Sequence, residues 1–317
     1  MFGQAMEKTW VLLANYTDDT LIHDYIAYDL YRYLSPDSAF VPMSQFVDLY
    51  INNVYIGVYM LTDQISADTS RINIRELAGY EPEKSDYLIE QEFRLQTQEK
   101  EGENIDWFWS RYNSITYKVH VPEEGISHAQ LEYIRDYTDK LYLLILHKDW
   151  ERVEQLIDVD SFITYFMVED MLREGDVQKA SNFYMKRAGG KLTVATIWDC
   201  DFTFGSGGSW YPVGSVNRSN YLFDALMEIP EFRERYLEAF YDCKDDAYNR
   251  ILNQIDLISS QYHDEFENDY FNWEIDNEWV IDEMKGLDSY DEQIERMKWW
   301  IEAQFMNLED QYMKDYG

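Results

Sequence analysis

Four oxygen-bearing side chains stand close together near the middle of the sequence: Asp176, Asn182, Asp199 and Asp201. Asp176 follows a helical pattern that ends near Arg173, and Asn182 begins the first strand of an expected hairpin. Asp199 and Asp201 follow its second strand. The strand ends remote from a hairpin turn lie side by side, so these side chains are expected to converge within one side-chain length. Carboxylate and amide oxygens are the ligands that Mg²⁺ or Mn²⁺ prefers.

The order of these residues matches the order used in phosphoryl transfer. In protein kinases a catalytic-loop Asp orients the attacking hydroxyl, an Asn shortly after it holds one metal ion, and an Asp after the next hairpin holds the metal ions on the nucleotide phosphates. Asp176, Asn182 and Asp199 occupy those three places. The competing interpretation is that they are turn and cap residues of a protein with 61 acidic residues. The order of these residues, with a hairpin between them, favours the functional interpretation.

Phosphate-binding residues are harder to assign. The sequence contains neither G-x-x-x-x-G-K-[ST] nor G-x-G-x-x-G. Nucleotide phosphates need cations, and Lys118 ends one β-rich run while Glu90 ends another, which predicts a kinase-like Lys–Glu pair. Arg71 is a further candidate. Each of these side chains is also typical of an ordinary strand or surface charge.

Other catalytic chemistries lack support. The five histidines are scattered and form no H-E-x-x-H motif, and no G-x-S-x-G elbow occurs. The two cysteines, Cys200 and Cys243, allow one disulfide but no four-cysteine zinc site. Cys200 lies inside the acidic motif, where neighbouring carboxylates are expected to raise the pKa of its thiol and make it a poor nucleophile.

The first part of the chain predicts a sheet with one helix. Thr20 is the expected cap of a helix that ends at Ser35-Pro36. Two β-rich runs flank Asn52-Asn53, a pair that tolerates positive φ, and predict a tight hairpin of residues 46–51 and 54–61. Further strands are expected at residues 71–74, 87–90 and 115–119.

After Pro122 the pattern becomes helical. Helices are expected from Ser127 to Ile145 and after Asp160, with a hairpin of residues 182–186 and 192–198. Residues past Tyr221 are predominantly helical, ending with a stretch over 290–313. The sequence therefore predicts an α+β fold with a strand-rich N-lobe of residues 1–122 and a helical C-lobe of residues 123–317, which carries the catalytic loop and the metal-binding hairpin.

Composition excludes several classes of protein. The formal net charge of −34 repels phosphate backbones, so nucleic acid is not an expected partner. Hydrophobic residues make up 46% and aromatic residues 17%, which excludes a disordered chain. No apolar run reaches the roughly 20 residues of a membrane span. The N-terminus shows no signal peptide, so any targeting segment is expected to be absent from this chain.

Several segments together resemble the spore coat protein H (CotH) kinase family. The similarity covers most of the chain in order: residues 10–20, 51–59 with the pattern N-G-x-Y-x-G-x-Y, 86–90 with G-Y-L-x-E, 182–184, 198–205 and 229–236. The segments Asn182-Phe183-Tyr184 and Trp198-Asp199-Cys200-Asp201-Phe202-Thr203-Phe204-Gly205 are the most specific of these.

The resemblance implies an atypical protein-kinase-like protein that uses ATP with Mg²⁺ or Mn²⁺ to phosphorylate Ser or Thr of a protein substrate. It also implies an extracytoplasmic setting, with secreted, spore-coat or cellulosome-associated partners. By position, Asp176 would be the catalytic-loop Asp, and Asn182 and Asp199 would be metal ligands. Asp201 would be a second acidic contributor to the metal site, and Trp198 would shape the nucleotide pocket.

The chain departs from the family pattern at three places. His23-Asp24 stands where the family usually has Arg-Asn, Asn53 stands in place of Gly, and Asp63 stands in place of Glu. The first departure removes a cation from a lobe that already has few, which weakens the case for tight ATP binding.

Two other functions stay open at this point. Asp199-Cys200-Asp201 is also the Asp-x-Asp of a metal-dependent glycosyltransferase, although the sequence lacks the repeated βαβ pattern of a nucleotide-binding parallel sheet. The third possibility is a noncatalytic extracellular module, in which the acids hold Ca²⁺ and the aromatic residues bind polysaccharide or protein.

Overall fold

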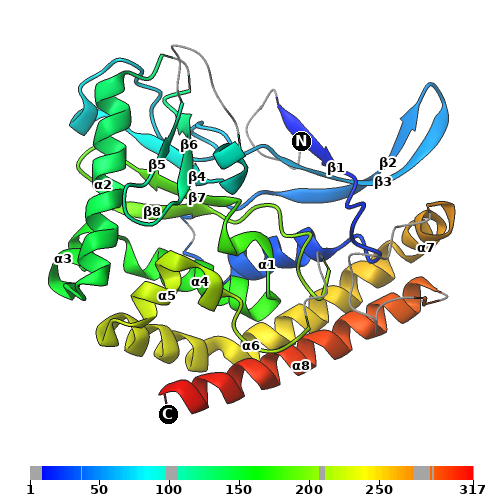
Figure 1. Ribbon diagram of the computed structural model, residues 1–317. Coiled ribbons are helices and arrows are strands. Elements are labelled where there is room, and N and C mark those ends of the chain that lie inside the picture. Colours follow the sequence, from blue (N-terminus) through cyan, green and yellow to red (C-terminus); the bar gives the residue numbers. More distant parts are fainter. Residues whose placement is uncertain are drawn as a thin grey trace.

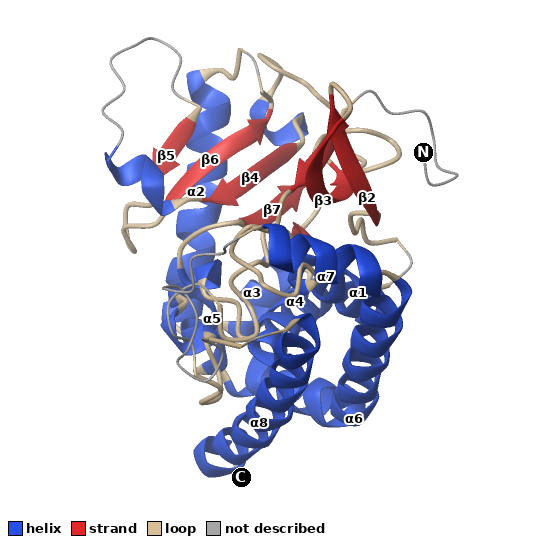
Figure 2. Ribbon diagram, turned by 90° about the vertical axis from the view of Figure 1, so that its right-hand side faces the viewer, coloured by secondary structure: helices blue, strands red, loops and turns tan. Residues whose placement is uncertain are grey.

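Two antiparallel sheets form one layer of the protein, and most helices form the layer beneath them (Figure 1). The computed structural model describes residues 9–36, 38–97, 106–123, 125–206, 211–273, 286–287 and 289–316. Figure 2 shows both sheets side by side above the helices. The mixture of antiparallel sheet and helix confirms the predicted α+β bilobal fold.

The smaller sheet has the strand order β1-β3-β2. Its strands are β1 (Trp10–Leu13), β2 (Ser44–Ile51) and β3 (Val54–Asp63). The turn between β2 and β3 is Asn52-Asn53, with φ of 52° and 63°. Asparagine tolerates this left-handed conformation better than most residues, and the predicted hairpin is confirmed.

The larger sheet has the order β5-β6-β4-β7-β8. Its strands are β4 (Tyr87–Gln91), β5 (Trp107–Trp109), β6 (Thr116–Val121), β7 (Asn182–Lys186) and β8 (Leu192–Thr196). The predicted β7–β8 hairpin forms, and it pairs with β4 from the first part of the chain. This sheet therefore draws strands from both sides of residue 122, and the division at that residue stays a prediction.

The strand expected at 71–74 does not form. Ile72 makes only an isolated bridge to Ala67. Ile72 and Ile74 are instead buried against Leu88, Val121 and Phe183 on one face of the larger sheet. Alternating apolar residues can bury their side chains against a sheet from a covering loop as well as from a strand, so the pattern did not require a strand here.

The helices are α1 (His23–Leu34), α2 (His128–Leu146), α3 (Trp150–Leu156), α4 (Val159–Leu172), α5 (Tyr221–Met227), α6 (Pro230–Gln261), α7 (His263–Asn272) and α8 (Tyr290–Tyr316). Short 3₁₀ helices are η1 (Pro82–Lys84), η2 (Phe93–Thr97), η3 (Asp176–Gln178) and η4 (Asn217–Ser219). Among the described helices, none is long and apolar enough to cross a membrane.

Helix starts differ from the sequence prediction in two places. Thr20 does not cap α1, because its backbone N–H and its hydroxyl both donate to Asp18 Oδ1, and the helix begins at His23. Asp158, rather than Asp160, caps α4 by accepting from Ser161 N–H. Ser127 caps α2 through a capping box with Gln130, as its position predicts.

Helix α4 lies at the centre of the molecule and is buried on nearly every side. Its Asp170 carboxylate is fully buried and accepts hydrogen bonds from three other segments. The donors are Ser215 Oγ (2.8 Å), Asn217 N–H (3.0 Å), Tyr236 Oη (3.1 Å) and Tyr312 Oη (2.7 Å). This one side chain ties α4 to the loop of residues 215–217, to α6 and to α8.

Replacement of Asp170 by Ala is expected to lower the free energy of unfolding by about 3–5 kcal/mol, because it leaves several buried donors without an acceptor. Chemical denaturation followed by circular dichroism measures this change. Asp310→Ala is the control, since the Asp310 carboxylate is 69% exposed and forms an exposed ion pair with Lys314. An Asp170→Ala protein as stable as the control would contradict the role of Asp170.

Candidate active site

The chain that leaves α4 builds the first part of the site. Arg173 caps the helix in the left-handed conformation, at φ of 54°, and donates to Gly214 O at 2.7 Å. The buried Glu174 then accepts from Asp176 N–H (2.6 Å) and Val177 N–H (2.9 Å) through Oε2. These two bonds set the turn of η3 and place Asp176 at its first position.

Asn182 secures the same loop from β7. Its fully buried side chain donates through Nδ2 to Val177 O (3.0 Å) and Ala180 O (2.6 Å). Its Oδ1 accepts from Tyr165 Oη of α4 at 3.0 Å. In this structure both ends of the amide are used to hold the loop against α4.

Asp199 and Asp201 follow β8 in a loop anchored by distant residues. Asp199 has a φ of 63° and accepts from Ser181 Oγ at 3.0 Å. Asp201 Oδ2 accepts from Thr17 Oγ1 at 2.6 Å. Between them, Cys200 N–H donates to the buried Asp24 Oδ1 of α1 at 2.8 Å. These contacts hold the loop, and those of Thr17 and Asp24 come from the N-terminal part of the chain.

Trp198 lies just before this loop and outside β8. It is half-buried, its ring stacks on Tyr28 of α1 at 6.1 Å, and it packs against both apolar clusters. The structure therefore shows Trp198 holding the loop to α1. Its expected part in a nucleotide pocket stays a prediction.

The electrostatics show that the carboxylates are close enough to affect one another. Burial raises the pKa of Asp176, the charge of Asp199 raises it further, and Lys179 and Arg94 oppose the shift. Burial also raises the pKa of Asp201, and Asp199 adds to that shift. The site is short of positive charge, which is the electrostatic condition that a bound cation relieves.

Burial is also the main cause that raises the pKa of the Cys200 thiol, and the charges of nearby carboxylates add to it. The expectation of an unreactive thiol is supported, with desolvation as the larger cause. Cys200 and Cys243 are both free, so the disulfide that the sequence allowed is not formed.

The three carboxylates of Asp176, Asp199 and Asp201 fit a divalent cation in donor chemistry. They do not, however, form a closed cluster of ligands. In the described part of the chain, no group of three His, Cys, Asp or Glu side chains is arranged to hold a metal ion. The expected convergence is thus partial, and the metal-ligand assignments of Asn182, Asp199 and Asp201 stay predictions.

The predicted Lys118–Glu90 pair is opposed in register but not joined. The two residues are cross-strand partners in β6 and β4. Lys118 instead forms an ion pair with Asp106, and Glu90 contacts His120 Nε2 at 2.7 Å. Each side chain therefore has a different partner, which strand register alone could not predict.

Arg71 is buried and serves the smaller sheet. It pairs with Asp63 at 3.2 Å, donates to Thr9 O at 2.5 Å and lies over the Trp10 ring at 5.6 Å. These contacts join the ends of β1 and β3. A role for Arg71 toward nucleotide stays a prediction.

Two cations near the carboxylates were missed in the sequence. Arg94 of η2 lies close enough to Asp176 and Asp199 to influence titration, and it also bonds Glu92 at 2.7 Å. In the sequence, Lys179 stands three residues after Asp176 and three before Asn182, and its ammonium is 4.7 Å from the Phe93 ring. This position between two candidate site residues could have identified Lys179 from the sequence. Arg94 reaches the site only because β4 pairs with β7.

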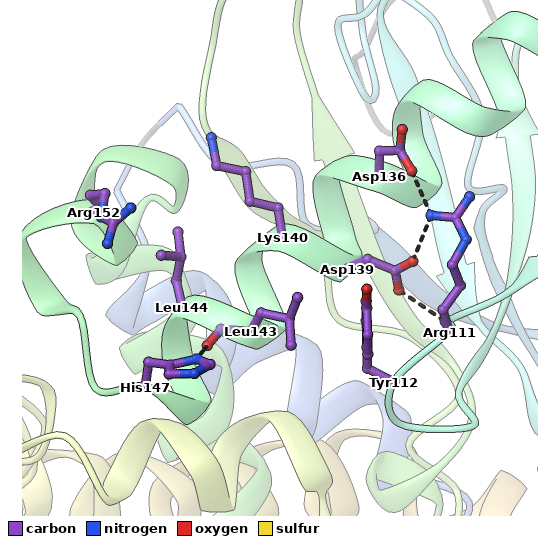
Figure 3. A pocket seen from close by; sticks show the side chains of 9 residues that line it. All are labelled: Arg111, Tyr112, Asp136, Asp139, Lys140, Leu143, Leu144, His147 and Arg152. Carbon is purple, nitrogen blue, oxygen red and sulfur yellow. Dashed lines mark hydrogen bonds and ion pairs between the residues drawn. The ribbon is translucent and has the colours of Figure 1, made fainter.

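A cavity of about 530 Å³ lies elsewhere, on α2, α3 and the turn after β5 (Figure 3). It contains none of the predicted site residues. Its Arg111 is held by Asp136 and by Asp139, which lies at 3.1 Å. Its charges are therefore largely paired within the protein.

Strand direction bears on the glycosyltransferase alternative. Every strand pairing of the two described sheets is antiparallel. The parallel sheet with crossover helices that commonly binds a nucleotide sugar is not found in the described residues.

Comparison with known protein families identifies the family to which the chain belongs. The model of the family described as CotH kinase protein matches residues 1–308, which is nearly the whole sequence. No curated protein matches the chain.

Buried acids next to the site predict an unusual dependence of stability on pH. Burial is the main cause that raises the pKa of Asp19 to about 7, of Asp24 to about 8 and of Glu169 to about 8. Between pH of about 4 and about 8 the folded protein then holds more protons than the unfolded chain, so stability falls as pH rises. Each group contributes at most about 1.4 kcal/mol per pH unit.

Thermal unfolding in EDTA is therefore expected at a lower temperature at pH 8 than at pH 5. The Asp24→Asn variant should show a smaller decrease, because Asn still accepts from Cys200 N–H but does not titrate. Asp310→Asn should keep the wild-type slope. A melting temperature that rises toward pH 8 would contradict this assignment.

Proposed function

Because the chain belongs to the CotH kinase family, a kinase-like family, we propose that it transfers the γ-phosphoryl group of ATP to a Ser or Thr hydroxyl of a protein substrate. One observation supports this most. Asp176, which precedes the β7–β8 hairpin, lies within electrostatic reach of Asp199, which follows it, and of two cations, Lys179 and Arg94. Protein kinases have the same order, with a catalytic Asp first and a metal-binding Asp later in the chain, and with cations close to the transferred phosphoryl group.

In this mechanism Asp176 orients the substrate hydroxyl and receives its proton. The hydroxyl oxygen bonds to the γ-phosphorus as the bond from that phosphorus to the bridging oxygen breaks, and ADP leaves. The partial burial that raises the pKa of Asp176 makes it a stronger base than an exposed carboxylate. Lys179 and Arg94 offset negative charge beside it.

A divalent ion, Mg²⁺ or Mn²⁺, supplies positive charge against the phosphates when bound. Asp199 and Asp201 are the carboxylates that would hold it. Ser181 and Thr17 keep these carboxylates oriented by donating to them, and Asp24 holds the backbone between them. Asn182 would join them as a ligand through Oδ1, which also accepts from Tyr165 Oη.

The substrate and the setting follow from the family rather than from the site. We propose that the acceptor is a secreted, spore-coat or cellulosome-associated protein and that the chain acts outside the cytoplasm. The acidic surface is compatible with this setting, because it favours basic partners over anionic ones.

Isothermal titration of ATP tests nucleotide binding. Binding is expected only with Mg²⁺ or Mn²⁺, and Asp199→Asn should weaken it at least about tenfold because a charged ligand is lost. Asparagine is the informative replacement, since it tolerates the positive φ of this position and still accepts from Ser181. Asp310→Asn should bind as wild type does.

Two results would count against nucleotide binding at this site. The first is an absence of binding with either metal. The second is equal affinity in the Asp199→Asn variant. Binding of a nucleotide sugar but not of ATP would favour the glycosyltransferase instead.

Transfer is tested separately with Asp176→Asn. Labelled ATP and a library of Ser- and Thr-containing peptides are the probes. The variant is expected to bind Mg²⁺–ATP within about twofold of wild type. Its transfer rate should fall by about 10²–10⁴-fold, because only the proton acceptor is lost. Equal rates in variant and wild type would remove Asp176 from the mechanism, and a wild-type protein that binds ATP but modifies neither peptides nor itself would contradict the kinase.

A further inference from the structure

A second site lies where the end of α7 meets the edge of β3. Figure 1 shows α7 near the β2–β3 hairpin, and Asp269 of α7 bonds β3 directly. A cavity of about 200 Å³ opens there, lined in part by Tyr16, Tyr59, Asp269 and Trp273. We call this cavity the α7 pocket. A second cavity of about 240 Å³ lies between α7 and the β2–β3 hairpin.

The α7 pocket contains a buried carboxylate with one oxygen left over. Asp269 is only 6% exposed, and its Oδ1 accepts from Val58 N–H at 2.8 Å. The structure shows no partner for Oδ2 within the described part of the chain. Because Asp269 lines the cavity, this oxygen can accept a hydrogen bond from a ligand that brings an N–H group.

The edge of β3 offers a second acceptor. β1 ends at Leu13, opposite Met60, so β3 has no partner strand on that side at Gly57–Tyr59. Val58 N–H points to this side, since it donates to Asp269. The N–H and C=O of one strand residue point the same way, so the Val58 carbonyl also faces the open edge.

Glycine at position 57 makes this close approach possible. Its φ is 146°, and a Cβ there would lie 2.8 Å from Asp269 Oδ1 and 3.2 Å from Trp273 Nε1. Any larger residue would push the end of α7 away from the strand. The pocket thus depends on a residue that the sequence motif already contains.

Aromatic rings form the walls of the pocket. Tyr16 is 59% exposed and Trp273 is 47% exposed, although both line a cavity. Trp273 is also the C-cap of α7, so the negative end of that helix dipole is directed here. Aromatic faces, a carboxylate and a helix C-terminus all attract positive charge.

The charges of the two cavities have one sign. Asp269 lines the first, and Asp48, Asp264 and Glu265 line the second. Among the residues that the structure describes, no Lys, Arg or His lines either cavity. Phosphate groups would be repelled here, and an uncharged base would leave these carboxylates without a counter-charge.

We propose that the α7 pocket binds a Lys or Arg side chain from a basic segment of a partner protein. The ammonium or guanidinium group donates to Asp269 Oδ2 and to the Val58 carbonyl and lies against the rings of Tyr16, Tyr59 and Trp273. A following basic residue pairs with the carboxylates of the second cavity. Tyr16 precedes Thr17, which bonds Asp201, so the bound segment lies beside the candidate active site.

The test uses no nucleotide and no metal, so its result is independent of phosphoryl transfer. The probe is a short acetylated and amidated Gly-Ser peptide with spaced arginines, and the matched peptide has glutamines instead. Calorimetry is expected to detect binding of the arginine peptide only. Asp269→Asn should weaken it about tenfold, and Tyr16→Ala about threefold. Asp310→Asn, which makes the same charge change near the far end of α8, should alter affinity less than about twofold.

Three results would overturn the proposal. One is equal binding of both peptides. Another is wild-type affinity in Tyr16→Ala, which decides the question even if Asp269→Asn does not fold, since Tyr16 is exposed in a loop. The third is displacement of the peptide by metal-free ATP whose own affinity depends on Asp269, which would assign the pocket to a nucleotide base.

Discussion

The burial of one acidic side chain, Asp170, constrains the arrangement of the whole helical layer. A carboxylate in a fully buried position is tolerated only when donors replace the lost water. Here the donors come from the loop before η4, from α6 and from α8, which are far apart in the sequence. Helix α4 therefore cannot move without leaving several polar groups unpaired, and it acts as the fixed reference for everything attached to it.

The candidate active site is attached to the end of that helix. Arg173 ends α4, Glu174 shapes the turn that presents Asp176, and Asn182 ties the turn back to Tyr165. The buried carboxylate of Glu174, four residues beyond Asp170, therefore sets the position of the proposed base. The loop that carries the other two carboxylates is held from the other side by Thr17 and Asp24. A site with this excess of negative charge is costly in the empty protein, and substrate-bound cations would offset that cost.

The same imbalance of charge connects the active site with the α7 pocket. Both combine partly buried carboxylates with few cations, and Tyr16 and Thr17 link them through consecutive residues. A protein with a net charge of −34 attracts basic segments over its surface in general. The aromatic walls and the open carboxylate oxygen of the α7 pocket would convert that general attraction into binding at one place.

Sequence alone determined the α+β class, the hairpins around Asn52-Asn53 and after Asn182, the capped start of α2 and the acids that approach one another near the second hairpin. These features depend on the conformational preferences of single residues and on residues that are close together in the sequence. Sequence could not show that Thr20 binds Asp18 rather than capping α1, that Lys118 chooses Asp106 over Glu90, or that Arg71 is buried against Asp63. Nor could it show that Arg94 faces Asp176, or that α7 covers Gly57. Only the tertiary structure decided these, because the partner of a charged or polar group is whichever group the packing of distant segments brings nearest.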